Sequence, residues 1–500
     1  MTHTARTHWP SGWIFILAAI GSAAGLGNLW RFPFLAYKHG GAAFILVLIL
    51  ANIIVGIPLL ILEVGLGQMT QRAAPEAFGH IKKGLRFVGW LALVFSFFVI
   101  SYYMAVMAWG VDYLAAAFQL GWGEHAKDFF FQKVLQLSDS VGNIGGFSWP
   151  VVAGFVVAWL AVYFSVWKGV KSVSKVVTWS ATLPFIILAI LIVRAITLPG
   201  SFAGLRAFFV PDWSALGDPQ LWIAAFSQVF FSLSLAFGIM VAYGSFKPER
   251  SEITKSVFWV ALGNFLVSLM SGIVVFGTIG YMAYQQGVPL QEAAQGGPSL
   301  AFVVFPTAIS LLPALNALIG VLFFVMLLSL AIDSAFSIVE GIAAPFRDRY
   351  PHLATEKIAL YVSIAGALGG LLFVTKAGLY FLDIVDHFVV NYGIVVMGIL
   401  EAFIVGWLWK EKKFHQYVNE HSKWKIGIGW DIAIKFVTPI FLTILLVWNL
   451  VQEFREPYSG YPVKALIAVG AAPLIAAPII AFVIDKLVGR AHAHHEHGSA

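Results

Sequence analysis

The sequence contains no cysteine, and only 11% of its 500 residues are charged. The absence of cysteine excludes a disulfide framework, a thiolate metal site and a cysteine nucleophile. Soluble globular proteins carry a charge on about a quarter of their residues, so this scarcity, beside 60% hydrophobic residues, indicates a protein dissolved in lipid. The net charge of +6 does not indicate nucleic-acid binding, because Lys and Arg stand in short segments between long apolar runs.

Long apolar runs dominate the chain, and about 20 apolar residues suffice for a helix to cross a bilayer. Six runs contain no Asp, Glu, Lys or Arg, and they cover residues 87–111, 140–167, 219–246, 256–291, 293–332 and 465–484. Shorter or less pure runs cover residues 12–37, 41–69, 176–193, 358–375, 379–409 and 436–452. Residues 287–316 contain four prolines, so we expect a re-entrant or capping loop there. The chain is thus predicted to span the membrane about twelve times.

Lys and Arg are concentrated in alternate loops, whereas the intervening loops hold few. The basic loops lie within residues 72–86, 168–175, 247–255, 347–357 and 410–425. Cytoplasmic loops are the ones that carry such an excess. We therefore expect a multi-pass protein of the inner (plasma) membrane with both termini in the cytoplasm, which requires an even number of spans. The first residues lack the pattern of a cleaved signal peptide, so the first apolar run is expected to remain in the protein.

Two of the predicted spans have centres rich in glycine and serine. The first reads GSAAGLGN over residues 21–28, and the sixth reads SLSLAFG over residues 232–238. Interrupted helices at matching positions of two halves indicate a binding site at the membrane midplane, where free carbonyls and amides hold ions and substrate. Because five spans separate the two, the halves are predicted to be inverted repeats. The alternative is that Gly21 and Gly25 form an ordinary helix-packing face.

The predicted domains follow from this repeat. They are a tail at 1–10, a first repeat at 11–200, a second repeat at 218–410, two further spans at 427–487 and a tail at 488–500. Several acidic residues stand within or at the ends of spans, where an unpaired charge is costly. They are Glu63, Asp333, Glu340, Asp386 and Glu401. Asp333 and Ser334 offer adjacent oxygens that suit an alkali cation, although a structural hydrogen bond explains a lone membrane aspartate equally well.

The segments GLGNLWRFP at 25–33, GGAAF at 40–44 and GIP at 56–58 with Glu63 resemble the neurotransmitter:sodium symporter family. Residues 228–238 are similar to the sixth helix of that family, and Asp333 with Ser334 to its eighth. The resemblance covers nearly the whole chain. It implies an all-α integral membrane protein of the LeuT fold, with twelve transmembrane helices, a 5+5 inverted repeat and helices 1 and 6 broken. It also implies a bacterial LeuT-like amino-acid transporter that is not an enzyme.

The resemblance further implies ligand sets. One sodium ion would be held by Ala23, Asn28, Ser232 and Asn264. A second would be held by Gly21, Ala24, Leu330, Asp333 and Ser334. The substrate would contact Ala23, Gly25, Leu26, Gly27, Val99, Tyr103, Phe231, Ser232, Ser234, Phe237, Ser334 and Ile338. Chloride would be held by Gln228, Ser232, Asn264 and Ser268, although Leu48 stands where chloride-dependent members have a tyrosine. Arg31 with Asp386 would form the outer gate, and Arg6 with Asp348 the inner gate.

Gly25 bears on the substrate class, because monoamine-carrying members have an aspartate at that position. A glycine leaves room for the carboxylate of an amino acid, and the apolar pocket favours a small neutral one. The predicted function is therefore sodium-coupled symport of a small neutral L-amino acid into the cell by alternating access. Two alternatives stay open on the sequence: a proton-coupled or facilitative permease of the same architecture, and a membrane sensor that binds an amino acid without moving it.

Overall fold

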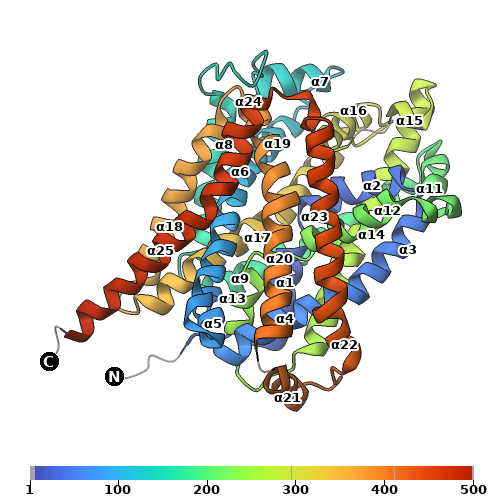
Figure 1. Cartoon of the computed structure of the whole chain (residues 1–500). Helices are drawn as coiled ribbons and strands as arrows, with labels where there is room; N and C mark the ends of the chain where they lie inside the picture. The colour runs from blue at the N-terminus through green and yellow to red at the C-terminus, as the bar shows by residue number, and fades with distance from the viewer. Residues whose placement is uncertain (1–5, 294–295, 410, 498–500) are drawn as a thin grey trace.

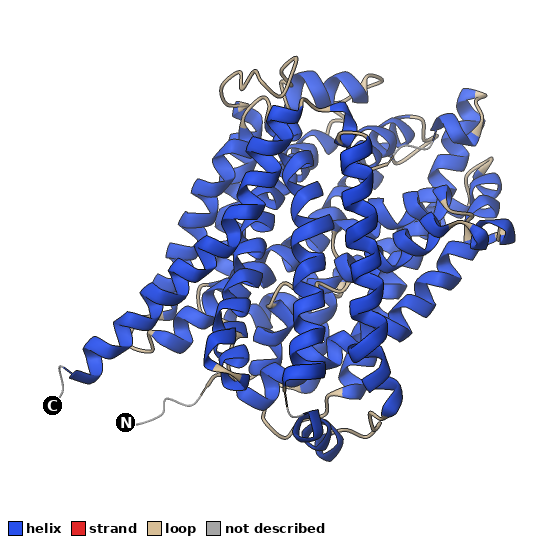
Figure 2. Ribbon diagram, in the orientation of Figure 1, coloured by secondary structure: helices blue, strands red, loops and turns tan. Residues whose placement is uncertain are grey.

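The computed structural model describes residues 6–293, 296–409 and 411–497, with the side chains of residues 411 and 489–497 left out. The described residues contain no strand, and one isolated bridge joins Phe147 to Thr375 (Figure 2). In chain order the elements are α1 (Gly12–Ala23), η1 (Gly27–Arg31), α2 (Phe32–Lys38), α3 (Ala42–Ala51), η2 (Asn52–Gly56), α4 (Ile57–Thr70), α5 (Ala74–Ile81), η3 (Lys83–Leu85), α6 (Arg86–Ala117), α7 (Ala126–Asp128), η4 (Phe129–Val134), α8 (Trp149–Val166), α9 (Val170–Ser180), α10 (Leu183–Ile196), α11 (Ser201–Phe209), η5 (Trp213–Gly217), α12 (Pro219–Ser232), α13 (Ile239–Ser245), α14 (Thr254–Gln286), α15 (Leu290–Ala293), η6 (Leu300–Val304), α16 (Phe305–Ser310), α17 (Asn316–Arg349), α18 (Thr355–Gly370), η7 (Leu371–Val374), α19 (Gly378–Phe388), η8 (Val389–Gly393), α20 (Ile394–Phe403), η9 (Ile404–Leu408), α21 (Glu411–His421), α22 (Ile428–Ile432), η10 (Ala433–Val437), α23 (Thr438–Arg455), η11 (Tyr458–Gly460), α24 (Val463–Ala465), η12 (Leu466–Ala471) and α25 (Ala472–His497).

Ten helical stretches of the described chain are long and apolar enough to cross a membrane. An eleventh span consists of α1 and the helix Gly27–Lys38, which meet at an angle of 57°. We assign α12 and α13 together as the twelfth span. Residues 233–238 interrupt it, so it is not one of the ten continuous stretches. The predicted all-α membrane architecture is therefore confirmed, and both spans predicted to be interrupted are broken.

The capping loop at residues 287–316 is also present, since α15, η6 and α16 are short pieces between α14 and α17. One predicted boundary was wrong. The run 140–167 is helical only from Trp149, because Gly145 and Gly146 take positive φ angles of 66° and 79°, which break a helix. The last candidate span ends at Val488, and its helix continues to His497. The repeat boundaries remain a prediction.

The helices differ in how deeply they lie in the bundle. In the apolar window of α6, 89% of the residues are buried, against 17% in the window of α25. The interior of the bundle is therefore built around α17, which contacts α1, α6 and α13, while α25 and α23 lie at the periphery (Figure 1). Figure 1 shows α5 and α21 at one end of the bundle and α7 and α24 at the other; we call these the α5 end and the α7 end.

Candidate transport site

The first break lies between α1 and η1. After Ala23 the backbone leaves the helical conformation at Ala24, with φ −81° and ψ 81°. The amide of Gly25 then donates to the Asn28 side-chain oxygen at 3.1 Å instead of continuing the helix. A helix that stops in the middle of a bundle leaves its last carbonyl groups without intrahelical partners. The break therefore presents carbonyl oxygens in the interior of the protein.

The second break lies between α12 and α13, where Ser234, Ala236 and Gly238 have φ angles of 53°, 66° and 71°. Left-handed conformations cost a non-glycine residue about 1–2 kcal/mol, so other groups must hold them in place. The amide of Ala236 donates to a Glu63 side-chain oxygen at 2.8 Å. The carboxylate of Glu63 also faces that of Glu401, and both residues are fully buried. Glu63 therefore supports the broken helix directly, with Glu401 beside it.

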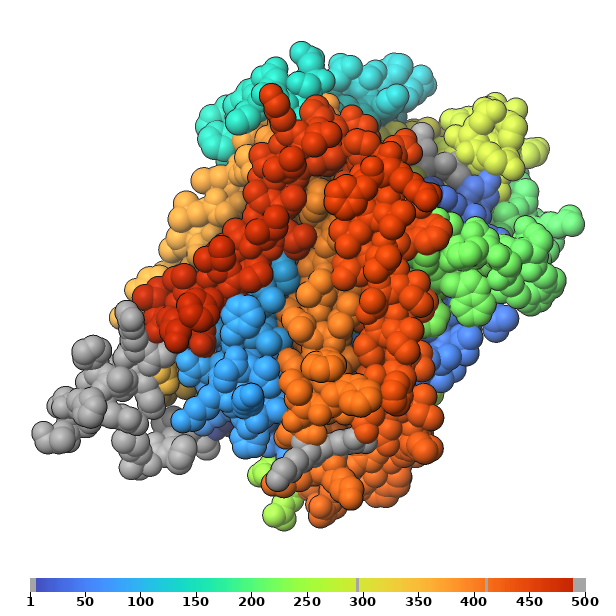
Figure 3. Space-filling model, in the orientation of Figure 1, coloured from blue at the N-terminus to red at the C-terminus, as the bar shows by residue number. Residues whose placement is uncertain are grey.

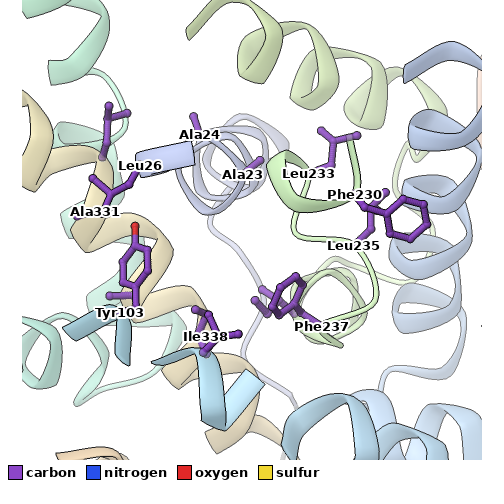
Figure 4. Close-up of a cluster of buried hydrophobic side chains, with 14 of the residues drawn as sticks. Ala23, Ala24, Leu26, Tyr103, Phe230, Leu233, Leu235, Phe237, Ala331 and Ile338 are labelled. Carbon is purple, nitrogen blue, oxygen red and sulfur yellow. The ribbon is translucent and has the colours of Figure 1, made fainter. Parts of the chain in front are cut away.

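A cavity of about 50 Å³ lies between the two breaks. Since one water needs roughly 10–15 Å³ by this measure, the cavity has room for a small solute only. Eleven of the twelve predicted substrate residues line it, and Ser232 does not; the lining also includes Ser22, Asn28 and Ile239. Figure 4 shows Tyr103 and Ile338 on one side of this region and Phe237 on another. The Tyr103 hydroxyl is buried without a hydrogen-bond partner, which suits it to bind a ligand.

Gly25 stands at a tight point of the cavity wall. A Cβ atom at this position would lie 2.6 Å from the Ser334 hydroxyl oxygen and 3.5 Å from that of Tyr103. Contacts below 3.0 Å require the neighbour to move. An aspartate side chain at position 25 would therefore enter the space of the cavity, which explains the glycine in physical terms.

The residues predicted for the first sodium ion come together around Asn28. The Asn28 side-chain nitrogen lies 2.8 Å from the Asn264 oxygen, 3.3 Å from the Ser232 hydroxyl and 2.8 Å from the Ser268 hydroxyl. The Asn264 nitrogen donates to Ser232 at 2.7 Å. Ala23 is the last residue of α1, and its carbonyl accepts from Gly25 at 3.0 Å. Hard oxygen atoms of amides, hydroxyls and carbonyls are thus concentrated here.

The residues predicted for the second sodium ion also meet. A Cβ atom on Gly21 would lie 2.4 Å from an Asp333 carboxylate oxygen, so the carboxylate rests directly on the backbone of α1. The other Asp333 oxygen has no hydrogen-bond partner, although the residue is only 1% exposed. Ser334 donates to the Ser22 carbonyl at 3.2 Å, and Leu330 lies one turn earlier on α17. No group of three His, Cys, Asp or Glu residues in the described chain is placed to hold a metal ion.

The remaining predicted chloride residue, Gln228, lies one turn before Ser232 on α12. It is 1% exposed, and both polar atoms of its side chain lack a hydrogen-bond partner. Leu48, at the position of the family tyrosine, is buried and supplies no hydroxyl.

The predicted gates are in different states. Arg6 forms an ion pair with Asp348 and donates to Ser245 at 2.6 Å. The Arg6 guanidinium also lies 4.8 Å from the centre of the Phe246 ring. Trp9 adds two hydrogen bonds of 2.9 Å, to the carbonyls of Tyr243 and Phe246. The α5 end is therefore closed.

The predicted outer pair does not form a direct ion pair. Arg31 donates to Ser227 at 3.0 Å and lies 5.2 Å from the centre of the Phe231 ring. Asp386 accepts a 2.5 Å hydrogen bond from Tyr102. Each partner is thus held by another residue, so the α7 end lacks the ionic closure that the α5 end has.

Sequence reasoning missed one buried cation beside the inner gate. From the sequence, Lys247 is expected to be a solvated charge in a loop, yet only 2% of its surface is exposed. Its ammonium donates to the Glu252 carbonyl at 2.6 Å and lies 4.1 Å from the centre of the Phe15 ring. Burial lowers the pKa of Lys247 to about 7. The only signal in the sequence is its place directly after the end of the broken span.

The fold and the site define an all-α membrane transporter whose two discontinuous helices enclose a small cavity beside polar clusters. The family model described as the sodium:neurotransmitter symporter family matches residues 6–128 and 123–487. The chain belongs to the sodium:neurotransmitter symporter family, and it is a sodium-dependent transporter, not an enzyme.

Curated relatives agree with this assignment. An uncharacterized sodium-dependent transporter of Methanocaldococcus jannaschii is 38% identical over 493 residues, which cover 97% of this chain and 99% of the relative. The human sodium- and chloride-dependent GABA transporter 2 is 30% identical, with 91% of this chain and 81% of the relative covered. The mouse protein of the same name is 32% identical with the same coverage.

Proposed function

We propose that the protein carries a small neutral L-amino acid together with sodium ions into the cell by alternating access. One observation carries this proposal: both helix breaks line the same cavity of about 50 Å³, and clusters of oxygen ligands lie beside it. An amino acid bound there would place its carboxylate near the Asn28 cluster. Because that carboxylate would complete the sodium shell, ion and substrate would each strengthen the binding of the other.

We propose two sodium ions, one at the Asn28 cluster and one between Gly21 and Asp333. The unpaired Asp333 oxygen and the carbonyls at the end of α1 support the second position. We place the α5 end in the cytoplasm of a cell whose inner (plasma) membrane holds the protein. The basic loops at this end support that orientation.

We also propose a chloride ion beside Gln228, Asn264 and Ser268. Two features support it: the unpaired amide of Gln228, and a transmembrane α14 that contains no Asp or Glu to supply a fixed negative charge. The human relative is named a sodium- and chloride-dependent transporter. Uptake that is equal in chloride and gluconate buffers would remove this ion from the proposal.

Reconstituted liposomes test the function directly. We expect uptake of a small neutral amino acid to require an inward sodium gradient and to collapse when potassium replaces sodium. A thermal-shift screen of the twenty amino acids, with and without sodium, identifies the substrate, because a ligand stabilises the state that it binds. Uptake driven by a proton gradient alone would establish the permease instead. Sodium-dependent stabilisation without any uptake would establish the sensor.

GABA is the second candidate substrate, because GABA transporters are among the relatives. GABA separates its carboxylate from its ammonium by three methylene groups, and the cavity is small and lined by Val99, Phe237 and Ile338 at its apolar side. We therefore favour the shorter α-amino acid. A competition assay distinguishes the two substrates by the displacement of bound, labelled alanine. Complete displacement by unlabelled GABA at a lower concentration than unlabelled alanine requires would favour GABA.

A further inference from the structure

A second, much larger cavity lies at the α5 end, away from the transport site. Its volume is about 700 Å³. It is formed by the end of α4, by α5, by the start of α6 and by the end of α17. Its charged lining consists of Arg72, Glu76, Lys83, Arg86, Asp348 and Arg349.

The lining has an excess of positive charge, with four cations against two carboxylates. Both carboxylates have cationic neighbours, since Asp348 pairs with Arg6 and Glu76 lies 3.7 Å from Arg86. Arg86 in turn contacts Asp485 of α25 at 2.7 Å.

Arg72 and Lys83 differ from these residues. No carboxylate in the described part of the chain pairs with either of them, and both are exposed. The cavity therefore offers two cations to a ligand at no cost in existing ion pairs.

The wall of the cavity continues into a helix that faces lipid. α25 packs on α6, and Asp485 and Val488 of α25 bind Arg86 and Arg349 at the cavity. Figure 3 shows α25 crossing beside the segment that contains α5 and α6. On α25, exposed apolar residues recur every four positions, at Ile475, Ile479, Val483 and Leu487, which expose 70%, 65%, 46% and 62% of their surface. An apolar track thus runs along the exposed side of α25, whose last turns also supply the contacts of Asp485 and Val488 at the basic cavity.

We propose that this cavity binds the phosphate group of an anionic phospholipid, with the acyl chains along the exposed side of α25. Arg and Lys bind phosphate oxygens by charge-assisted hydrogen bonds, and basic pockets between transmembrane helices hold such head groups. The volume of the cavity accommodates a phosphate with its attached polyol. A soluble phosphate ion shares this chemistry but makes no use of the apolar track.

The test uses the purified full chain in detergent. Its thermal unfolding is followed during titration with dioctanoylphosphatidylglycerol, with dioctanoylphosphatidylcholine and with inorganic phosphate. We expect phosphatidylglycerol to raise the midpoint in a saturable manner and the other two probes to leave it unchanged. The double variant Arg72→Gln/Lys83→Gln should bind phosphatidylglycerol roughly 30-fold more weakly, at about 1 kcal/mol for each cation.

The matched control is Lys412→Gln/Lys413→Gln, which removes two exposed cations from α21 at the same end of the bundle. This control should keep the wild-type response. If the double variant does not fold, Lys83→Gln alone takes its place with a smaller expected loss. Three results would overturn the proposal: an equal effect of phosphatidylcholine, a wild-type response of the Arg72/Lys83 variant, or an equal loss in the α21 control. A full response to inorganic phosphate would overturn the lipid as occupant.

Discussion

The hydroxyl group of Ser234 donates a 3.0 Å hydrogen bond to the carbonyl oxygen of Ser22, which joins the two broken helices directly. Ser234 stands within the break of the sixth span, and Ser22 near the end of α1. Ser334 of α17 donates to the same carbonyl at 3.2 Å. One backbone oxygen thus connects three helices at the wall of the cavity. Movement of α1 during transport must change or break these bonds.

Replacement of Ser234 by alanine should loosen this junction. A hydrogen bond of this kind contributes about 1 kcal/mol, so we expect roughly fivefold weaker sodium-dependent substrate binding. Isothermal titration or a binding assay at fixed sodium measures the change. Ser174→Ala is the control, because Ser174 donates only to the Val170 carbonyl within α9. Binding by Ser234→Ala at wild-type strength would show that the junction plays no part in holding the site.

Asp333→Asn should reduce the affinity for sodium. The substitution keeps an oxygen beside Gly21 but removes the negative charge, and interactions with charged groups contribute about 1.5–3 kcal/mol. We expect the sodium concentration for half-maximal stabilisation to rise by roughly tenfold or more. Asp383→Asn serves as the control, because Asp383 accepts hydrogen bonds from Tyr458 and Tyr461 far along the chain from α17. An unchanged sodium titration of Asp333→Asn would reject its role as an ion ligand.

Ala236→Gly should stabilise the protein. Ala236 has φ 66°, a conformation that glycine adopts without the steric cost of a Cβ atom, so we expect a gain of about 1 kcal/mol. The control is also an alanine-to-glycine substitution, but at a position with a regular helical backbone. Ala242 lies inside α13, where glycine costs about 1 kcal/mol, so Ala242→Gly should lower the unfolding midpoint. Equal shifts of the two variants in one direction would contradict the argument.

The sequence allowed the membrane class, the two breaks and most of the cavity wall to be predicted. The membrane class and the breaks depend on local composition, such as the glycines at 21–27, whereas the residues of the cavity wall follow from the resemblance to the symporter family. The hydrogen bond from the Ala236 amide to Glu63 could not be predicted, because 173 residues separate the two and only the fold brings them together. The contact of the Arg6 guanidinium with the face of the Phe246 ring could not be predicted for the same reason, because the two residues stand far apart in the chain.

Asp348→Ala should open the α5 end. Asp348 pairs with Arg6 and also accepts a 2.9 Å hydrogen bond from the Ala73 amide, so its removal takes away the charge partner of Arg6 and the acceptor of the buried Ala73 amide. We expect a single cysteine introduced at Ser245, in a chain that has no other cysteine, to react faster with a thiol reagent in the variant. Because Ser245 accepts a hydrogen bond from Arg6 in the inner gate, the reference is the same cysteine chain with Asp348 intact, and the difference in labelling rate reports the effect of Asp348→Ala. Equal labelling rates in both backgrounds would reject Asp348 as part of the inner gate.

The buried cation Lys247 makes the stability of the α5 end dependent on pH. Its pKa is about 7 in the folded protein, below the ordinary value of 10.5, because burial disfavours the ammonium form. The unfolded chain therefore binds a proton that the folded chain has released between about pH 7 and pH 10.5, and stability must rise with pH over this window. We expect the unfolding midpoint of the wild type to increase from pH 7 to pH 9 by more than that of Lys247→Met, which lacks the titrating group. Lys255→Met, at an exposed position nearby, should follow the wild type. If Lys247→Met has the same pH dependence as the wild type, the ammonium of Lys247 is not destabilised by its surroundings, and the Phe15 ring and the Glu252 carbonyl fully replace its hydration.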